Sequence, residues 1–139
     1  GPVRPALVLR QLPGLHDDWL VCMVSTRLRQ EIQGFDEVLQ ETDPDFADSG
    51  LKQTSLVRAP RLAVVAGQVF HGTIGAVSDE RLARVQAQLS EWIGAQSGQK
   101  VTDMAVPDVA RTKDLVEAED ERLYPATDGK PMGETGAQG

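Results

Sequence analysis

The sequence has few aromatic residues and almost no cysteine. Phe, Trp and Tyr make up 4% of the 139 residues, so aliphatic side chains must form most of the hydrophobic core. The single cysteine, Cys22, excludes an internal disulfide and any cysteine-rich metal site. The sequence also lacks an apolar run of the ~20 residues that a membrane-spanning helix needs, and it has no charged-then-apolar leader. We therefore expect a soluble, cytoplasmic protein that does not contact membranes.

A strong positive charge is missing as well. The formal net charge is -7, but it is distributed unevenly. Residues 1–100 contain ten Lys or Arg and twelve Asp or Glu, for a net charge of -2, whereas residues 101–139 contain four and nine, for -5. This excludes a broad basic face for duplex nucleic acid, although a small site with a few arginines remains possible. Because the second segment has sparse apolar residues, we expect one domain over residues 1–98 and an acidic tail, disordered or a fused remnant, over residues 99–139.

Aliphatic runs predict several short strands in the first part of the chain. Residues 3–9 and 19–25 are apolar on both faces, which is typical of buried strands. Pro5 has no N–H group and is expected near a strand start or at a sheet edge. Further strands are expected at residues 37–39, 53–59, 63–66 and 69–77, with Pro60 separating the second from the third. Residues 41–50, rich in acids and turn formers, predict a long surface loop.

The clearest expected element is a helix that follows Ser78. Serine is a strong N-cap residue, and Asp79 and Glu80 in the first turn interact favourably with the helix dipole. A single apolar stripe follows at helical spacing, formed by Leu82, Val85, Leu89, Trp92 and Ile93, and Gly94 ends the helix. Several short strands and one terminal helix predict a β-rich α+β fold in which a small β-barrel packs against the helix.

Four segments resemble motifs of the PemK/MazF toxins, and they occur in the order typical of that family. They are residues 3–9 with the pair Arg4-Pro5, residues 19–27 with a hydroxyl residue near the strand end, residues 49–58, and residues 74–82. Together they cover about residues 1–95. The family's first strand, and the loop that joins it to Arg4, are missing from the sequence. Residues 123–135 loosely resemble the N-terminal leader of a restriction-endonuclease-like family.

The resemblance implies an SH3-like barrel of the PemK/CcdB type that acts as a homodimer. It also implies the toxin of a type II toxin-antitoxin system, silenced by a cognate antitoxin, that cuts single-stranded RNA such as mRNA without a metal or a cofactor. Elementary chemistry is compatible with such a reaction, because RNA supplies its own nucleophile, the 2′-hydroxyl. The protein needs only to orient that hydroxyl, move protons and stabilise charge on the phosphate oxygens.

The matched motifs give candidate residues for this chemistry. Arg4 is the candidate for stabilising the phosphate, because a guanidinium stays charged and offers a planar fork of donors. Ser25 is the matched hydroxyl that could hold a phosphate oxygen or the 2′-hydroxyl, and Thr26, on the opposite strand face, is the alternative. Four basic residues could contact flanking phosphates, with ordinary surface charge as the alternative: Arg27, Arg29, Lys52 and Arg58.

The histidines and the cysteine have simpler interpretations. His71 falls in an expected strand and is favoured as a structural residue, and His16 falls in a turn. Neither has neighbours at metal-ligand spacing, so no metal site is expected. Cys22 alternates with the apolar Leu20 and Val24 and is expected in the core rather than as a nucleophile.

Two other functions stay open at this point. One is a non-catalytic barrel of the same fold that binds a protein target, as the toxins that grip gyrase do. The other is an inactive remnant, because a missing strand leaves an unpaired sheet edge and an incomplete groove. The pairing of Arg4 with a strand-end hydroxyl favours the ribonuclease.

Overall fold

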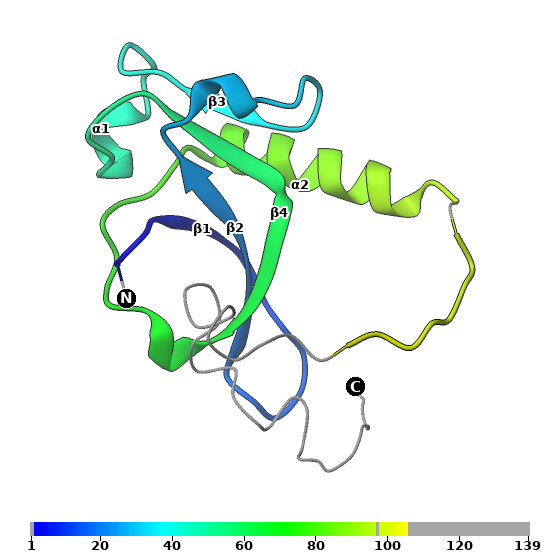
Figure 1. Cartoon of the computed structure of the whole chain (residues 1–139). Helices are drawn as coiled ribbons and strands as arrows, with labels where there is room; N and C mark the ends of the chain where they lie inside the picture. The colour runs from blue at the N-terminus through cyan, green and yellow to red at the C-terminus, as the bar shows by residue number, and fades with distance from the viewer. Residues whose placement is uncertain (1, 97, 106–139) are drawn as a thin grey trace.

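A computed structural model describes residues 2–96 and 98–105 and contains one curled antiparallel sheet (Figure 1). Its strands are β1 (Ala6–Gln11), β2 (Asp18–Ser25), β3 (Glu37–Leu39) and β4 (Ser55–Ala66), in the order β1-β2-β4-β3. The helix α2 (Asp79–Gly94) lies along one side of the sheet. Three short helices occupy the connections: η1 (Leu28–Gln30), α1 (Phe46–Ser49) and η2 (Gly67–Val69). The sheet is a half-barrel with a terminal helix, as the β-rich α+β prediction requires.

The expected acidic tail falls almost wholly on residues 106–139, which lie outside the described residues. The resemblance of residues 123–135 to a restriction-endonuclease leader lies outside them too. The division into a domain of residues 1–98 and a tail of residues 99–139 therefore stays a prediction.

The hydrophobic core lies between the sheet and α2. Cys22, Val57 and Ala59 of the sheet are buried together with Val85 of α2, and Leu9 of β1 adds to them. The predicted position of Cys22 in the core is confirmed. Aliphatic side chains form this cluster almost entirely, as the scarcity of aromatic residues requires.

The helix begins as its sequence predicts. The Ser78 hydroxyl accepts a hydrogen bond from the Arg81 backbone N–H (3.1 Å), which satisfies one of the free donors of the first turn. The apolar stripe packs on the sheet only in its first part. Trp92 instead contacts Phe35 edge-to-face, with ring centroids 6.2 Å apart, and Ile93 is 73% exposed. The stripe was therefore predicted two residues too long, because Trp92 and Ile93 do not pack in the core cluster.

The prolines shift two strand boundaries. β1 begins at Ala6 rather than at residue 3, because Pro5 has no N–H group to donate; its carbonyl still accepts from the Val24 N–H (3.4 Å). The separate strands expected at 53–59 and 63–66 form the single strand β4, so that prediction was wrong. The pairing of β2 with β4 shifts register at one point: Met23 pairs with Arg58, but Cys22 pairs with Leu62. The extra residues of β4 form a bulge that contains Pro60.

The strand expected at residues 69–77 does not form. After η2 the chain leaves the sheet and crosses α1 as irregular backbone before α2 begins (Figure 1). The Ala76 N–H donates to the Asp48 carbonyl (2.8 Å), and a Cβ atom on Gly75 would overlap that same carbonyl oxygen. Gly75 therefore permits a close backbone crossing rather than a bend within a strand.

The expected surface loop at residues 41–50 is only partly on the surface. It contains α1, and two of its polar residues, Asp45 and Ser49, are buried. Asp45 accepts a hydrogen bond from the Ser78 backbone N–H (3.0 Å), which joins the loop to the start of α2. Two acidic residues of this segment, Asp43 and Asp45, also bind the guanidinium of Arg81.

Arg81 on α2 uses all five of its guanidinium N–H groups in hydrogen bonds. Its Nε and Nη2 donate to the two oxygens of Asp45 (2.9 and 3.1 Å), and Nη2 also donates to Asp43 (3.1 Å). Its Nη1 donates to Glu37 (3.0 Å) and to the Val38 carbonyl (3.2 Å). The Arg81 side chain is 7% exposed, so these charges are held largely away from water.

Replacing Arg81 by methionine should lower the free energy of unfolding by about 3–5 kcal/mol, because carboxylates would be left without their buried cation. Arg84 is the matched control: it pairs with Glu37 but is 52% exposed, so Arg84→Met should cost less than about 1 kcal/mol. Urea denaturation of both variants measures the difference. An Arg81→Met protein as stable as Arg84→Met would contradict the central role given to this cluster.

Asp45 should make the stability fall at acid pH. Its hydrogen bonds with the Arg81 guanidinium hold the pKa of Asp45 well below its usual range, although burial opposes the shift. The folded state therefore binds fewer protons than the unfolded state. The stabilisation should be complete above the unfolded pKa of about 4 and be lost as the pH falls below it. Denaturation at a series of pH values checks this, and Asp45→Asn should show a smaller loss over the same acid range; an equal loss would contradict the assignment.

Candidate functional site

The start of β1 and the end of β2 bring Arg4 and Ser25 opposite each other. Ala6 pairs with Met23 in this antiparallel ladder, and the Val24 N–H donates to the Pro5 carbonyl one residue beyond. The same register continued by one more residue sets Arg4 across from Ser25. Because side chains alternate along a strand, Ser25 belongs to the face that contains Met23 and its partner Ala6. Arg4 precedes β1 by two residues.

Arg58 of β4 lies on this same face. It pairs directly with Met23, and residues directly opposite in a sheet share a face. The Arg58 Nη1 donates to the side-chain oxygen of Gln30 (3.0 Å), and its Nε is buried without a hydrogen-bond partner among the described residues. The sheet therefore supplies Arg58 and Ser25 to one face, and Arg4 precedes the neighbouring strand β1.

The opposite face of these strands belongs to the core. Leu7 pairs with Cys22, and both pack in the cluster that contains Val57 and, from α2, Val85. Ser25 and Arg58 belong to the face turned away from α2. Val21 and Leu56 lie on this same face and are buried, so part of it is covered by other segments of the chain.

The two hydroxyl candidates differ in their surroundings. Ser25, the last residue of β2, is half-buried, and its Oγ accepts a hydrogen bond from the Arg27 backbone N–H (3.0 Å). The Ser25 hydroxyl proton stays free to be donated to a ligand. Thr26 is exposed and lies beyond the strand, where the alternation of faces no longer applies.

The remaining basic candidates surround the same end of the sheet. Arg27 and Arg29 belong to the exposed segment that follows β2, and η1 is part of it. Lys52 is exposed and precedes the start of β4, whose second residue pairs with Ser25. Because β2 ends where β1 and β4 begin, the fold brings together at one end residues that are scattered through the first 58 positions of the sequence.

The histidines and the cysteine lie elsewhere or are inert. His16 and His71 are both exposed, and His71 is in the irregular segment after η2 rather than in a strand. Burial, and secondarily the nearby Asp36 carboxylate, raise the pKa of Cys22 to about 12, so the thiol stays protonated near neutral pH. Within the described part of the chain, no group of three or more His, Cys, Asp or Glu side chains is arranged to hold a metal ion.

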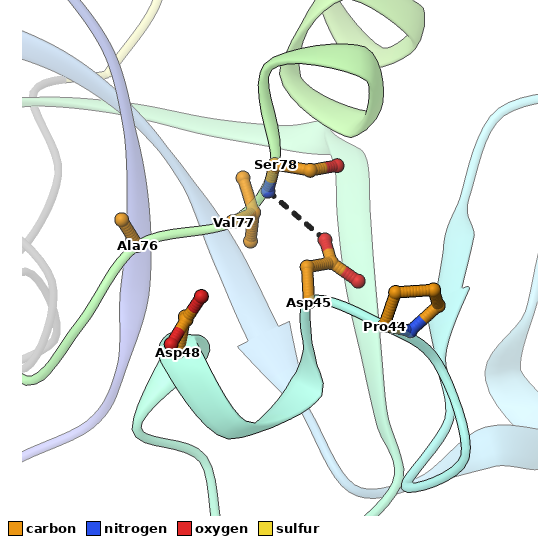
Figure 2. A pocket seen from close by; sticks show the side chains of 6 residues that line it. All are labelled: Pro44, Asp45, Asp48, Ala76, Val77 and Ser78. Carbon is orange, nitrogen blue, oxygen red and sulfur yellow. Dashed lines mark hydrogen bonds between the residues drawn. The ribbon is translucent and has the colours of Figure 1, made fainter.

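A hollow of about 280 Å³ lies beside the start of α2 (Figure 2). Its lining residues are Pro44, Asp45, Asp48, Ala76, Val77 and Ser78. Figure 2 shows the Asp45 carboxylate directed at the Ser78 backbone nitrogen, and Arg81 engages the same carboxylate. The charged side chains that line the hollow are acidic and would repel the phosphates of a nucleic acid. The hollow is therefore a poor candidate for an RNA site.

The comparisons with known proteins decide the family. The family model described as "PemK-like, MazF-like toxin of type II toxin-antitoxin system" matches residues 1–93, about two thirds of the chain. The chain belongs to this toxin family. The match runs from the strand of Arg4 almost to the end of α2 and confirms the resemblance inferred from four short motifs. No curated protein matches the chain.

Membership implies a protein partner for the toxin. A type II toxin has an antitoxin as its partner, so a protein that binds this chain is expected from the family itself. Within residues 2–96 and 98–105, no helix is long and apolar enough to span a bilayer.

Sequence reasoning missed two residues that the structure makes prominent. Arg81 lies one helical turn before the buried Val85, so the two side chains are on the same face of α2. This four-residue spacing is the only local sign that the Arg81 side chain is buried. Gln30 gave no signal, because it lies in an irregular segment outside any motif and its partner, Arg58, is 28 residues away.

Proposed function

We propose that this toxin is an endoribonuclease that cuts single-stranded RNA, including mRNA, by metal-independent attack of the 2′-hydroxyl. The observation on which the proposal depends is the register that sets Arg4 across from Ser25, whose sheet face is turned away from α2. A cation beside a hydroxyl donor is what a phosphodiester needs when charge develops on its oxygens.

The reaction needs only the substrate, water and these side chains. The 2′-oxygen attacks the adjacent phosphorus and loses its proton to water, and the bond from phosphorus to the 5′-oxygen breaks. The departing 5′-oxygen takes a proton from water, so the products are a 2′,3′-cyclic phosphate and a 5′-hydroxyl. Arg4 stabilises the negative charge on the phosphate oxygens in the transition state. Ser25, with Thr26 as the alternative, orients the 2′-hydroxyl or a phosphate oxygen.

The surrounding basic residues extend the RNA site. Arg27, Arg29, Lys52 and Arg58 contact phosphates on either side of the cut, which positions the strand without reading its bases. The chain's modest charge agrees with a short single-stranded site rather than a duplex surface. In this proposal the toxin works as a homodimer in the cytoplasm, needs no cofactor, and is silenced by its cognate antitoxin.

Cleavage should persist in EDTA and should require a 2′-hydroxyl at the cleaved position. The purified chain is incubated with a mixed single-stranded RNA, and the products are mapped and tested for a 2′,3′-cyclic phosphate. An oligonucleotide with 2′-deoxyribose at the mapped position should stay intact. Loss of activity in EDTA with recovery on adding magnesium would overturn the mechanism. Absence of cleavage would instead favour the non-catalytic barrel or the inactive remnant.

Arg4→Ala should lower the cleavage rate by about 10²–10³-fold and leave the fold intact. Arg4→Lys should recover little of the rate, because an ammonium group lacks the planar fork of donors. Ser25→Ala and Thr26→Ala decide which hydroxyl contributes. Arg10, an exposed arginine farther along β1, is the matched control, and Arg10→Ala should cut at the parent rate. A folded Arg4→Ala protein, verified by circular dichroism, that cuts at the parent rate would remove Arg4 from the mechanism.

A further inference from the structure

The segment of residues 26–30, called here the arginine loop, is fastened to the sheet at both ends. At its start the Arg27 N–H donates to the Ser25 Oγ (3.0 Å), and at its end the Gln30 side chain accepts from Arg58 of β4 (3.0 Å). Between these points the η1 turn is closed by the Gln30 N–H, which donates to the Arg27 carbonyl (3.0 Å). Two exposed arginines are thereby presented on a loop with fixed ends.

The contact with Gln30 engages only one of the N–H groups of Arg58. A guanidinium has five N–H groups, and Arg81 uses all of its own in hydrogen bonds. Arg58 uses one, and no carboxylate forms an ion pair with it in the described part of the chain. Its Nε is nonetheless buried and without a partner. A buried donor without a partner is costly unless a ligand satisfies it.

The acceptor that holds Arg58 is a neutral amide oxygen, that of the Gln30 side chain. A carboxylate in the place of Gln30 would hold Arg58 more strongly but would also cancel its charge. The neutral amide oxygen fixes the guanidinium and leaves the full positive charge for an anion. The Arg58 side chain is thus held in position while its Nη2 group makes no hydrogen bond to the described residues.

We propose that Gln30 is a positioning residue that holds Arg58, and with it the arginine loop, in the geometry that binds an RNA phosphate next to the scissile one. This inference rests on the proposed ribonuclease function for its substrate. Gln30 does not touch the RNA in this arrangement; it acts through Arg58. Its loss should therefore have an effect only when Arg58 is present.

A double-mutant cycle tests this dependence directly. The variants are Gln30→Met, Arg58→Met and the double variant, and the probe is a fluorescent, mixed-sequence single-stranded RNA with 2′-O-methyl groups, which the proposed reaction cannot cut. Gln30→Met should weaken binding about 10-fold, the effect of losing one hydrogen bond to a charged group. In the Arg58→Met background the same change should have no further effect. An equal loss in both backgrounds, or none in either, would overturn the proposal.

Two further variants separate positioning from general stability. Gln33 lies in the same irregular stretch, is exposed and makes no side-chain hydrogen bond to the described residues, so Gln33→Met should bind like the parent. Gln30→Glu keeps an acceptor for Arg58 but neutralises its charge. The Gln30→Glu variant should keep the thermal stability of the parent but bind RNA more weakly. The slope of log affinity against log salt concentration should fall by about 0.7, the value for one phosphate contact. Parent-like affinity in a folded Gln30→Glu protein would contradict the positioning role.

Cleavage kinetics distinguish a failure of the positioning role of Gln30 from a failure of the proposed ribonuclease function. Gln30→Met should raise KM with little change in kcat, because a flanking phosphate is held equally in the ground state and the transition state. If the parent cuts RNA and Gln30→Met has parent KM and affinity, only the positioning role fails. If the parent binds the probe with the predicted cycle but cuts nothing, the ribonuclease proposal fails while the role of Gln30 in RNA binding stands.

Discussion

The fold depends on one buried arginine. Arg81 joins α2 to β3 and to the segment around α1, and neither of these two pieces has enough residues to be stable alone. β3 has three residues and α1 has four, so the ion pairs add to the pairing of β3 with β4 and to the burial of Leu39 in holding them in place. Because a guanidinium with all donors engaged tolerates little movement, this cluster also fixes the direction in which α2 crosses the sheet.

The same fixation leaves the other face of the sheet free of α2. With α2 anchored over the Cys22 face, the face with Ser25 and Arg58 is not needed to form the core with the helix. Arg81 and Arg58 illustrate the division. Arg81 is saturated by carboxylates and contributes stability, whereas Arg58 is held by one neutral amide and keeps its charge. A chain with a net charge of -7 therefore has a guanidinium on this face that no carboxylate of the described residues neutralises.

Much of the fold could be predicted because its signals are local. A few neighbouring residues are enough to identify the Ser78 cap and the apolar runs of β1 and β2. The sequence therefore predicts the bounds of these elements to within about three positions. The errors have non-local causes. β4 continues past Pro60 because a bulge in its pairing with β2 accommodates the proline, and residues 70–78 leave the sheet because α1, far back in the chain, engages their backbone. Neither partner can be inferred from the segment itself.

The candidate site could be proposed from the sequence only to the extent that the family motifs contain its residues. Arg4 and Ser25 lie in two matched segments, and the ordinary antiparallel register of those strands brings them face to face. Arg81 and Asp45 are 36 residues apart, and Gln30 and Arg58 are 28 apart, so each pair exists only once the whole sheet has formed. A motif can name the residues that act on a substrate, because their types follow from the chemistry. The residues that hold them depend on which loops the fold brings together, and that requires the three-dimensional structure.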